Sequence, residues 1–164
     1  MKHKNFIATS LIFLSIAPNL ANAQKIESGI AKKDAVFFNY VNKYDNTGFI
    51  KNPVVWKAIA NVVPSDLQKS VLPRLNVQPP IYYYDNFIIA SGCKPHSCGS
   101  DEAEVWFDIG SKNAIIILLI DGNYSVYTKD YEWETLPLLI KAKLTDYEKL
   151  RPQPANIKVF KKDN

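Results

Sequence analysis

The chain predicts a single α+β domain, with an antiparallel sheet of about five strands and helices before and after it packed on one face. Two observations lead to this prediction. Between about 81 and 128, short apolar segments rich in β-branched and aromatic residues alternate with turn residues. On either side of that region, apolar residues instead recur at steps of three and four, which is typical of amphipathic helices.

Residues 1–23 have the pattern of a cleaved secretory signal peptide. A basic start, Lys2-His3-Lys4, precedes an apolar run from 6 to 17, and Ala21-Asn22-Ala23 forms a small-x-small cleavage site. The apolar run is shorter than the roughly 20 residues that span a bilayer, so we expect no membrane contact after cleavage. The mature domain would comprise residues 24–164 and reside in a bacterial periplasm.

Cleavage would lower the formal net charge from +4 to +2, because 18 basic and 16 acidic side chains would remain once Lys2 and Lys4 were removed. Binding to nucleic acid relies on concentrated positive charge. We therefore expect no nucleic-acid partner.

The segment before the sheet is expected to be helical in two parts. From about 30 to 44 the apolar stripe predicts an amphipathic helix that ends near Asn46-Thr47-Gly48. Between 53 and 73, a short helix is expected to stop at Pro64, and Ser65-Asp66 is a good N-cap for a further turn or two.

The sheet region divides into strands joined by short connections. Asp85-Asn86 predicts a tight hairpin, since both residues tolerate the positive φ of two-residue turns. The five expected strands are 81–84, 87–91, 104–109, 114–120 and 124–128, and the composition of 114–120 indicates burial on both faces. A helix is then expected from Thr135 to about Leu150, followed by a loose tail from about 151.

The unusual side-chain chemistry lies in one short loop, Cys93-Lys94-Pro95-His96-Ser97-Cys98, between two of these strands. It holds the only two cysteines of the chain and the only histidine of the mature part. In an exported protein an even number of cysteines predicts a disulfide, here between Cys93 and Cys98. Closing a ring of roughly six residues contributes only about 2 kcal/mol of chain entropy, so the bond would mainly shape the loop.

Three interpretations of the loop follow from the residues alone. Metal or thiol chemistry through Cys93, His96 and Cys98 requires free thiols, which export disfavours, and the chain has no other catalytic motif. We therefore expect no enzyme, metal or cofactor. A second interpretation is a stiff turn that presents His96 to another molecule, flanked by the acidic side chains of Asp101, Glu102 and Glu104. The third is a purely structural staple, with the acids on an ordinary solvated face.

The loop resembles the signature of the Ivy family, periplasmic inhibitors of vertebrate, or chicken-type, lysozyme, whose pattern reads Cys-Lys-Pro-His-Asp-Cys. Both cysteines, the lysine, the proline and the histidine fall at matching positions, and Ser97 stands where the family has Asp. The order of helix, hairpin, loop, further strands and late helix is also similar.

The resemblance implies a proteinaceous inhibitor of chicken-type lysozyme that helps a bacterium evade host defence. Residues 93–98 would enter the active-site cleft, with His96 at the catalytic carboxylates. From the residues themselves we expect Lys94 and Pro95 to give the loop its shape and rim, and Asp101 and Glu102 to be candidate rim contacts. A homodimer is a further implication of the family. The alternative function is a disulfide-stapled envelope protein that binds another periplasmic or host ligand.

Overall fold

The structure is a computed structural model that describes residues 34–150 and 158–161 of the chain. The predicted leader, residues 1–23, and the start of the predicted 30–44 helix lie outside the described residues. Within the described ranges, no helix is both long enough and apolar enough to cross a bilayer.

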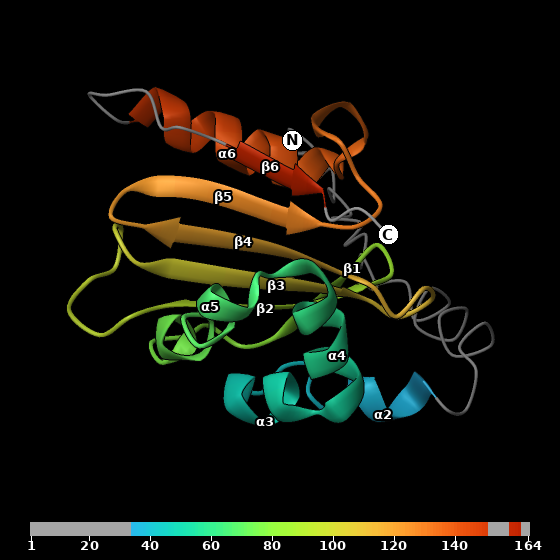
Figure 1. Cartoon of the computed structure of the whole chain (residues 1–164). Coiled ribbons are helices and arrows are strands. Elements are labelled where there is room, and N and C mark those ends of the chain that lie inside the picture. Colours follow the sequence, from blue (N-terminus) through green and yellow to red (C-terminus); the bar gives the residue numbers. More distant parts are fainter. Residues whose placement is uncertain (1–33, 151–157, 162–164) are drawn as a thin grey trace, which may run out of the picture. The chain divides into compact units, whose positions relative to one another are not determined.

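A six-stranded sheet forms the centre of the fold, with its strands side by side in chain order (Figure 1). Neighbouring strands from β1 to β5 pair antiparallel, and the last pair, β5 with β6, is parallel. The strands are β1 (Tyr82–Tyr84), β2 (Phe87–Cys93), β3 (Glu102–Asp108), β4 (Ala114–Ile120), β5 (Asn123–Thr128) and β6 (Lys158–Lys161). The predicted α+β class with a meander of short strands is confirmed.

Two of the connections are tight turns with left-handed backbone. Asp85 and Asn86 have φ angles of 45° and 71°, and Asp121 and Gly122 have φ angles of 48° and 81°. Such angles match the right-handed twist of the strands that the turn joins. The turn at Asp85-Asn86 confirms the predicted hairpin.

The helices before the sheet are shorter than the sequence predicts. They are α2 (Ala35–Phe38), α3 (Asn46–Lys51), α4 (Pro53–Val62), α5 (Ser65–Gln68) and the 3₁₀ turn η2 (Leu72–Leu75). The prediction of a helix through residue 44 was wrong, because Asn42 adopts a φ of 64° and its N–H donates to the carbonyl of Ile81. A new helix then starts where the expected one was to end, with the Asp45 carboxylate accepting from the N–H of Gly48.

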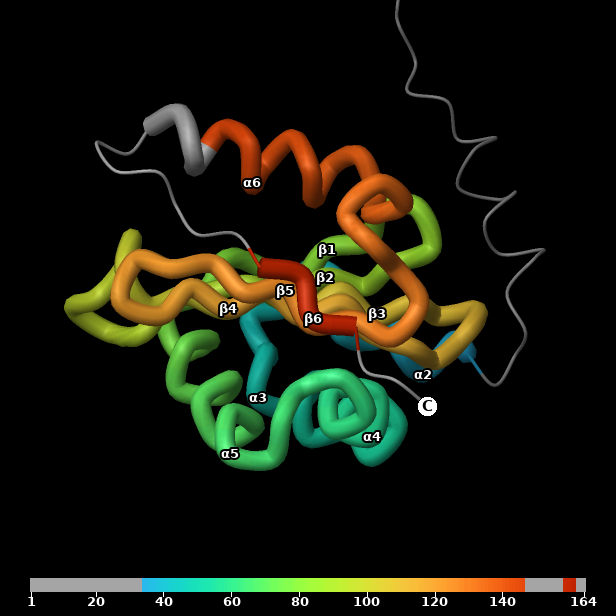
Figure 2. The backbone as a smooth tube through the Cα atoms, turned by 45° about the horizontal axis from the view of Figure 1, so that its top comes forward, coloured from blue at the N-terminus to red at the C-terminus, as the bar shows by residue number. Residues whose placement is uncertain are grey.

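Helices cover both faces of the sheet, so the prediction of packing on one face was wrong. One core cluster joins α2, α3 and α4 to alternate strand residues such as Val105 and Phe107. The other joins the C-terminal helix α6 (Leu138–Leu150) and Leu136, which follows the 3₁₀ turn η3 (Trp133–Thr135), to the intervening residues, including Trp106. Figure 2 shows α6 on one side of the strands and α3, α4 and α5 on the other. Because β4 is apolar at every position, both of its faces must be covered.

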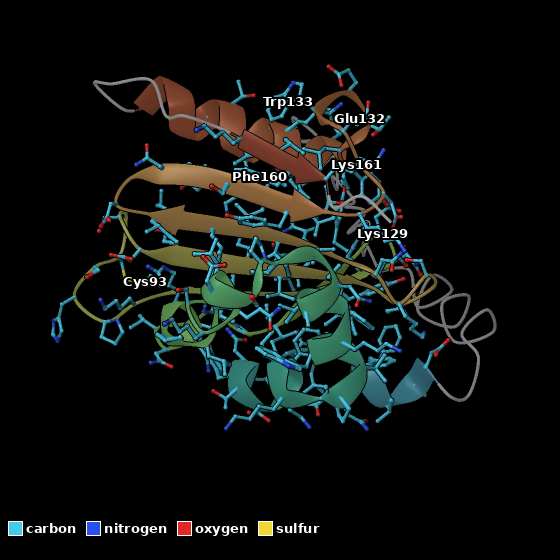
Figure 3. The ribbon with its side chains drawn as sticks, viewed as in Figure 1. Cys93, Lys129, Glu132, Trp133, Phe160 and Lys161 are labelled. Atoms are coloured by element: carbon cyan, nitrogen blue, oxygen red, sulfur yellow. A yellow bond between two sulfur atoms is a disulfide. The ribbon has the colours of Figure 1, made fainter. Side chains whose placement is uncertain are left out.

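Residues Lys158–Lys161 form β6 rather than part of a loose tail. Val159 packs against the core cluster under α6, and the ring of Phe160 stacks on that of Tyr127 with 5.1 Å between centroids. The Lys161 ammonium lies 3.1 Å from the carboxylate of Glu132, just before η3 (Figure 3). The chain therefore returns to the sheet after α6.

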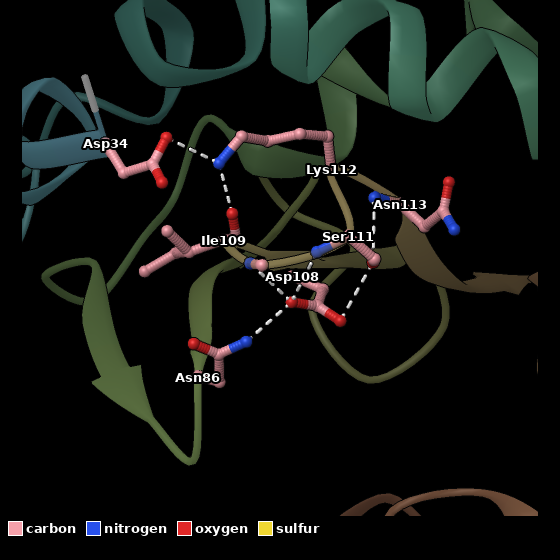
Figure 4. Close-up of polar contacts among 8 residues, drawn as sticks. Asp34, Asn86, Asp108, Ile109, Ser111, Lys112 and Asn113 are labelled. Carbon is pink, nitrogen blue, oxygen red and sulfur yellow. Dashed lines mark hydrogen bonds and ion pairs between the residues drawn. The ribbon is translucent and has the colours of Figure 1, made fainter. Parts of the chain in front are cut away.

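A polar network closes the β3–β4 turn, at the end of β3 away from the cysteine loop (Figure 4). The Asp108 carboxylate accepts hydrogen bonds from the backbone of Gly110 and from the side chains of Ser111 and Asn86. Next to it, the Lys112 ammonium lies 2.7 Å from the carboxylate of Asp34 and also donates to the carbonyl of Ile109. This ion pair ties the residue before α2 to the turn.

Candidate functional site

The cysteine loop connects the end of β2 to the start of β3, and Figure 3 marks Cys93 where the chain leaves the sheet. Cys93 and Cys98 form the predicted disulfide, with their Cα atoms 5.1 Å apart. Cys93 is buried as the last residue of β2, whereas Cys98 is exposed. Since both cysteines are used in the bond, the loop has no thiolate for metal binding or nucleophilic chemistry.

The tip of the loop is a β-turn that starts at Lys94 and ends at Ser97. The Ser97 N–H donates to the carbonyl of Lys94 at 3.0 Å, Pro95 takes the second position, and His96 takes the third with a φ of 64°. Proline second and a positive φ third are the signature of a type II turn. Histidine is one of the few residues other than glycine that adopt this φ with any frequency, and here its side chain is exposed.

Asp101 closes the base of the loop through its backbone. Its carbonyl accepts from the N–H of Lys94 at 2.9 Å, and its N–H donates to the carbonyl of Ser97 at 2.9 Å. The same Ser97 carbonyl also accepts from the Ser100 side chain at 3.1 Å. These bonds hold the two ends of the turn to one residue.

The two acidic side chains after the loop contact the protein itself. The Asp101 carboxylate lies 2.5 Å from the guanidinium of Arg74 on η2. The Glu102 carboxylate accepts from the N–H of Gly99 at 2.7 Å, where the chain turns with a φ of 89°. Both acids therefore hold the loop in shape, and a direct contact of either with a partner stays a prediction.

The chain around η2 covers the inner side of the loop base. Val77 and Cys93 exchange two backbone hydrogen bonds of 3.1 and 2.9 Å, which adds a short bridge beside β2. A Cβ on Gly92 would lie only 2.7 Å from the carbonyl oxygen of Val77, so this approach requires glycine. On the other side, the Gly122 N–H of the β4–β5 turn donates to the carbonyl of Ser100 at 3.2 Å.

More than half of the chain matches one known protein family. The model of the family described as inhibitor of vertebrate lysozyme (Ivy) matches residues 54–150, which run from within α4 through the loop to the end of α6. The chain belongs to the Ivy family. No curated protein and no solved structure matches it.

The part of the chain matched by the Ivy model also contains a partly buried ion pair near the loop. Glu104 on β3 is only 5% exposed, accepts from the indole N–H of Trp106 at 3.1 Å, and pairs with the ammonium of Lys143 on α6. Burial lowers the pKa of Lys143, and the neighbouring Glu102 carboxylate opposes that shift. Glu104 thus lies in the interior of this Ivy protein, and its expected place on the acidic flank of the loop was wrong.

Sequence reasoning identified the loop residues 93–98 of this Ivy protein but not the residues that support them. Arg74 and Val77 lie 27 and 16 positions before their partners Asp101 and Cys93, beyond the reach of local patterns. Only Gly92 offered a signal, since a glycine at the end of a strand often marks a close backbone approach.

Proposed function

We propose that this Ivy protein inhibits chicken-type lysozyme by inserting loop 93–98 into the active-site cleft, with His96 against the catalytic carboxylates. Members of the family are inhibitors of vertebrate lysozyme. The observation that carries the proposal is the exposed His96 at the third position of a proline-containing turn, inside a disulfide ring. Such a loop presents its imidazole in a fixed position, so little ordering of the loop is needed on binding.

The chemistry of the cleft suits an imidazole. Lysozyme uses one protonated carboxyl as general acid and one ionised carboxylate that stabilises or attacks the sugar. A histidine ring has two nitrogens and can hydrogen-bond to both groups. Hydrogen bonds that involve a charged partner contribute about 1.5 to 3 kcal/mol each. Occupying both carboxyls would exclude the substrate, and the inhibitor needs no turnover of its own.

The preformed loop reduces the entropy cost of binding. Ordering a flexible side chain at an interface costs about 0.5 to 1.5 kcal/mol, and ordering loop backbone costs more. Here Lys94, Ser97, Gly99 and Asp101 already use their backbone N–H groups inside the protein. Lys94 and Pro95 would then contact the rim of the cleft, with Ser97 behind the tip.

The remaining parts of the proposal concern where and in what form the inhibitor acts. We infer that residues 1–23 direct export, that the mature chain acts in the periplasm against lysozyme from a host, and that it pairs with itself as a homodimer. Sedimentation of the mature protein would measure its oligomeric state, and a single species with the mass of one chain would contradict the homodimer.

A lysis assay tests the proposed function. Purified mature protein is titrated against a chicken-type lysozyme while the clearing of a bacterial cell-wall suspension is followed. We expect the rate of clearing to fall to zero as the inhibitor reaches molar excess. Undiminished lysis at micromolar excess would contradict the proposal and favour a loop that binds another periplasmic or host ligand.

A further inference from the structure

We propose that Arg74 is a positioning residue for the inhibitory loop, and that its ion pair with Asp101 acts as a second restraint that backs up the disulfide. The two restraints would be redundant, so that either one keeps His96 in its presenting geometry. The predicted loss of inhibition rests on the proposed function, whereas the predicted change in the order of the loop does not.

The ion pair holds the residue on which the loop closes. Both backbone polar groups of Asp101 bond to the loop, to Lys94 and Ser97, and its carboxylate contacts the Arg74 guanidinium at 2.5 Å. Any displacement of Asp101 from Arg74 would therefore displace both ends of the turn that carries His96. We call this contact the brace.

The brace is anchored firmly on the other side. The Arg74 side chain is only 12% exposed, its partner carboxylate is 14% exposed, and a second guanidinium nitrogen donates to the carbonyl of Ser70 at 2.9 Å. Leu75, the next residue, is buried in the core, and Val77 pairs with Cys93. Because η2 is fixed to the core, the ion pair between Arg74 and Asp101 can restrain the position of the loop.

The disulfide restrains a different part of the same loop. It joins Cys93 to Cys98, whereas the brace acts on Asp101, three positions further along the chain. The hydrogen bond from the Asp101 N–H to the carbonyl of Ser97, the neighbour of Cys98, connects the two restraints. When two contacts limit the same motion, removing both has a larger effect than the separate effects predict.

The test compares four variants with the wild-type mature protein. R74M/D101N removes the brace and leaves no buried charge without its partner. C93A/C98A removes the disulfide, and the quadruple variant removes both restraints. D34N/K112M is the matched control, because it removes an ion pair of 2.7 Å with 13% and 31% exposed side chains at the other end of β3.

Two measurements are made on each variant, the inhibition constant for lysozyme and the hydrogen exchange of the Ser97 and Asp101 amides in the free protein. We expect either single removal to weaken inhibition by no more than about fivefold and the joint removal by about a hundredfold, a coupling factor of about four. Amide exchange should follow the same order. The control should keep wild-type inhibition and wild-type exchange at both amides.

Three results would overturn the brace: a joint effect equal to the product of the single effects, unchanged amide exchange when R74M/D101N is added to C93A/C98A, or an equal loss of inhibition in the control. A wild-type protein that does not inhibit lysozyme would overturn the proposed function instead. In that case the exchange measurements still decide whether the brace orders the loop.

Discussion

Replacing His96 by alanine is the most direct test of the inhibitory loop. The side chain is exposed in the free protein, so its removal leaves no cavity and no buried group without a partner. Alanine adopts a φ of 64° less readily than histidine, so the substitution adds backbone strain that lowers stability. The strain must therefore be separated from the loss of the imidazole.

The chain contains a matched control for that strain. Asn42 has the same φ of 64°, is also exposed, and lies between α2 and α3 rather than in the loop. H96A and N42A should lower the free energy of unfolding by similar amounts in urea titrations. Only H96A should weaken inhibition, because only His96 is proposed to reach the carboxylates of lysozyme.

The expected loss follows from the bonds that the imidazole would make. Truncating one partner of a buried hydrogen-bonded charge contact at an interface costs about 2 to 5 kcal/mol. At about 1.4 kcal/mol for each factor of ten, the inhibition constant should rise about thirtyfold to several thousandfold. Titration of lysozyme in the lysis assay measures it directly. Equal inhibition constants for H96A and N42A would refute a contact between His96 and the catalytic carboxylates.

Three further predictions concern residues around the loop. G92A should destabilise the fold by about 1 to 3 kcal/mol in urea, because its Cβ would meet the Val77 carbonyl, and a wild-type midpoint would contradict that packing. S97D restores the acid of the family pattern and should tighten inhibition more at low than at high salt, if it meets a cation on lysozyme; a salt-independent constant argues against such a contact. Burial lowers the pKa of Lys143 in the folded protein below the ordinary 10.5 of the unfolded chain. Between the lowered pKa and 10.5 the unfolded chain binds more protons than the folded protein, so stability rises with pH. Unfolding in urea from pH 8 to 10 should show that rise in the wild type and a smaller one in K143M, and parallel profiles would contradict it.

The strands could be predicted because their signals are local. Asp85-Asn86 specifies its hairpin, and β4 has the bounds, 114–120, that its apolar run predicts. The side on which α6 packs was missed, although β4 contained the clue: a strand that is apolar on both faces cannot leave one of them in water. The left-handed turn at Asn42 depends on a backbone hydrogen bond to the carbonyl of Ile81, 39 positions later, which local sequence patterns cannot predict.

In the site, too, the features set by neighbouring residues could be predicted, and those set by residues distant in the sequence could not. The disulfide and the exposed His96 could be predicted from six consecutive residues of a chain that is expected to be exported. Asp101 and Glu102 looked like surface charge because their partners, Arg74 and the Gly99 N–H, are visible only once the chain is folded. In the folded protein both acids support the loop, and a contact of either with a partner stays a prediction.

The position of β6 bears on how the protein avoids self-association through its sheet. β6 covers the outer backbone of β5, and its own lysines, Lys158 and Lys161, become the charged border of the sheet. Lysines on a border strand discourage other chains from adding to it. Without residues 158–161 the edge backbone of β5 would lack its pairing strand and the ring of Tyr127 would lose the stacked ring of Phe160, so this short segment shields one border of the sheet.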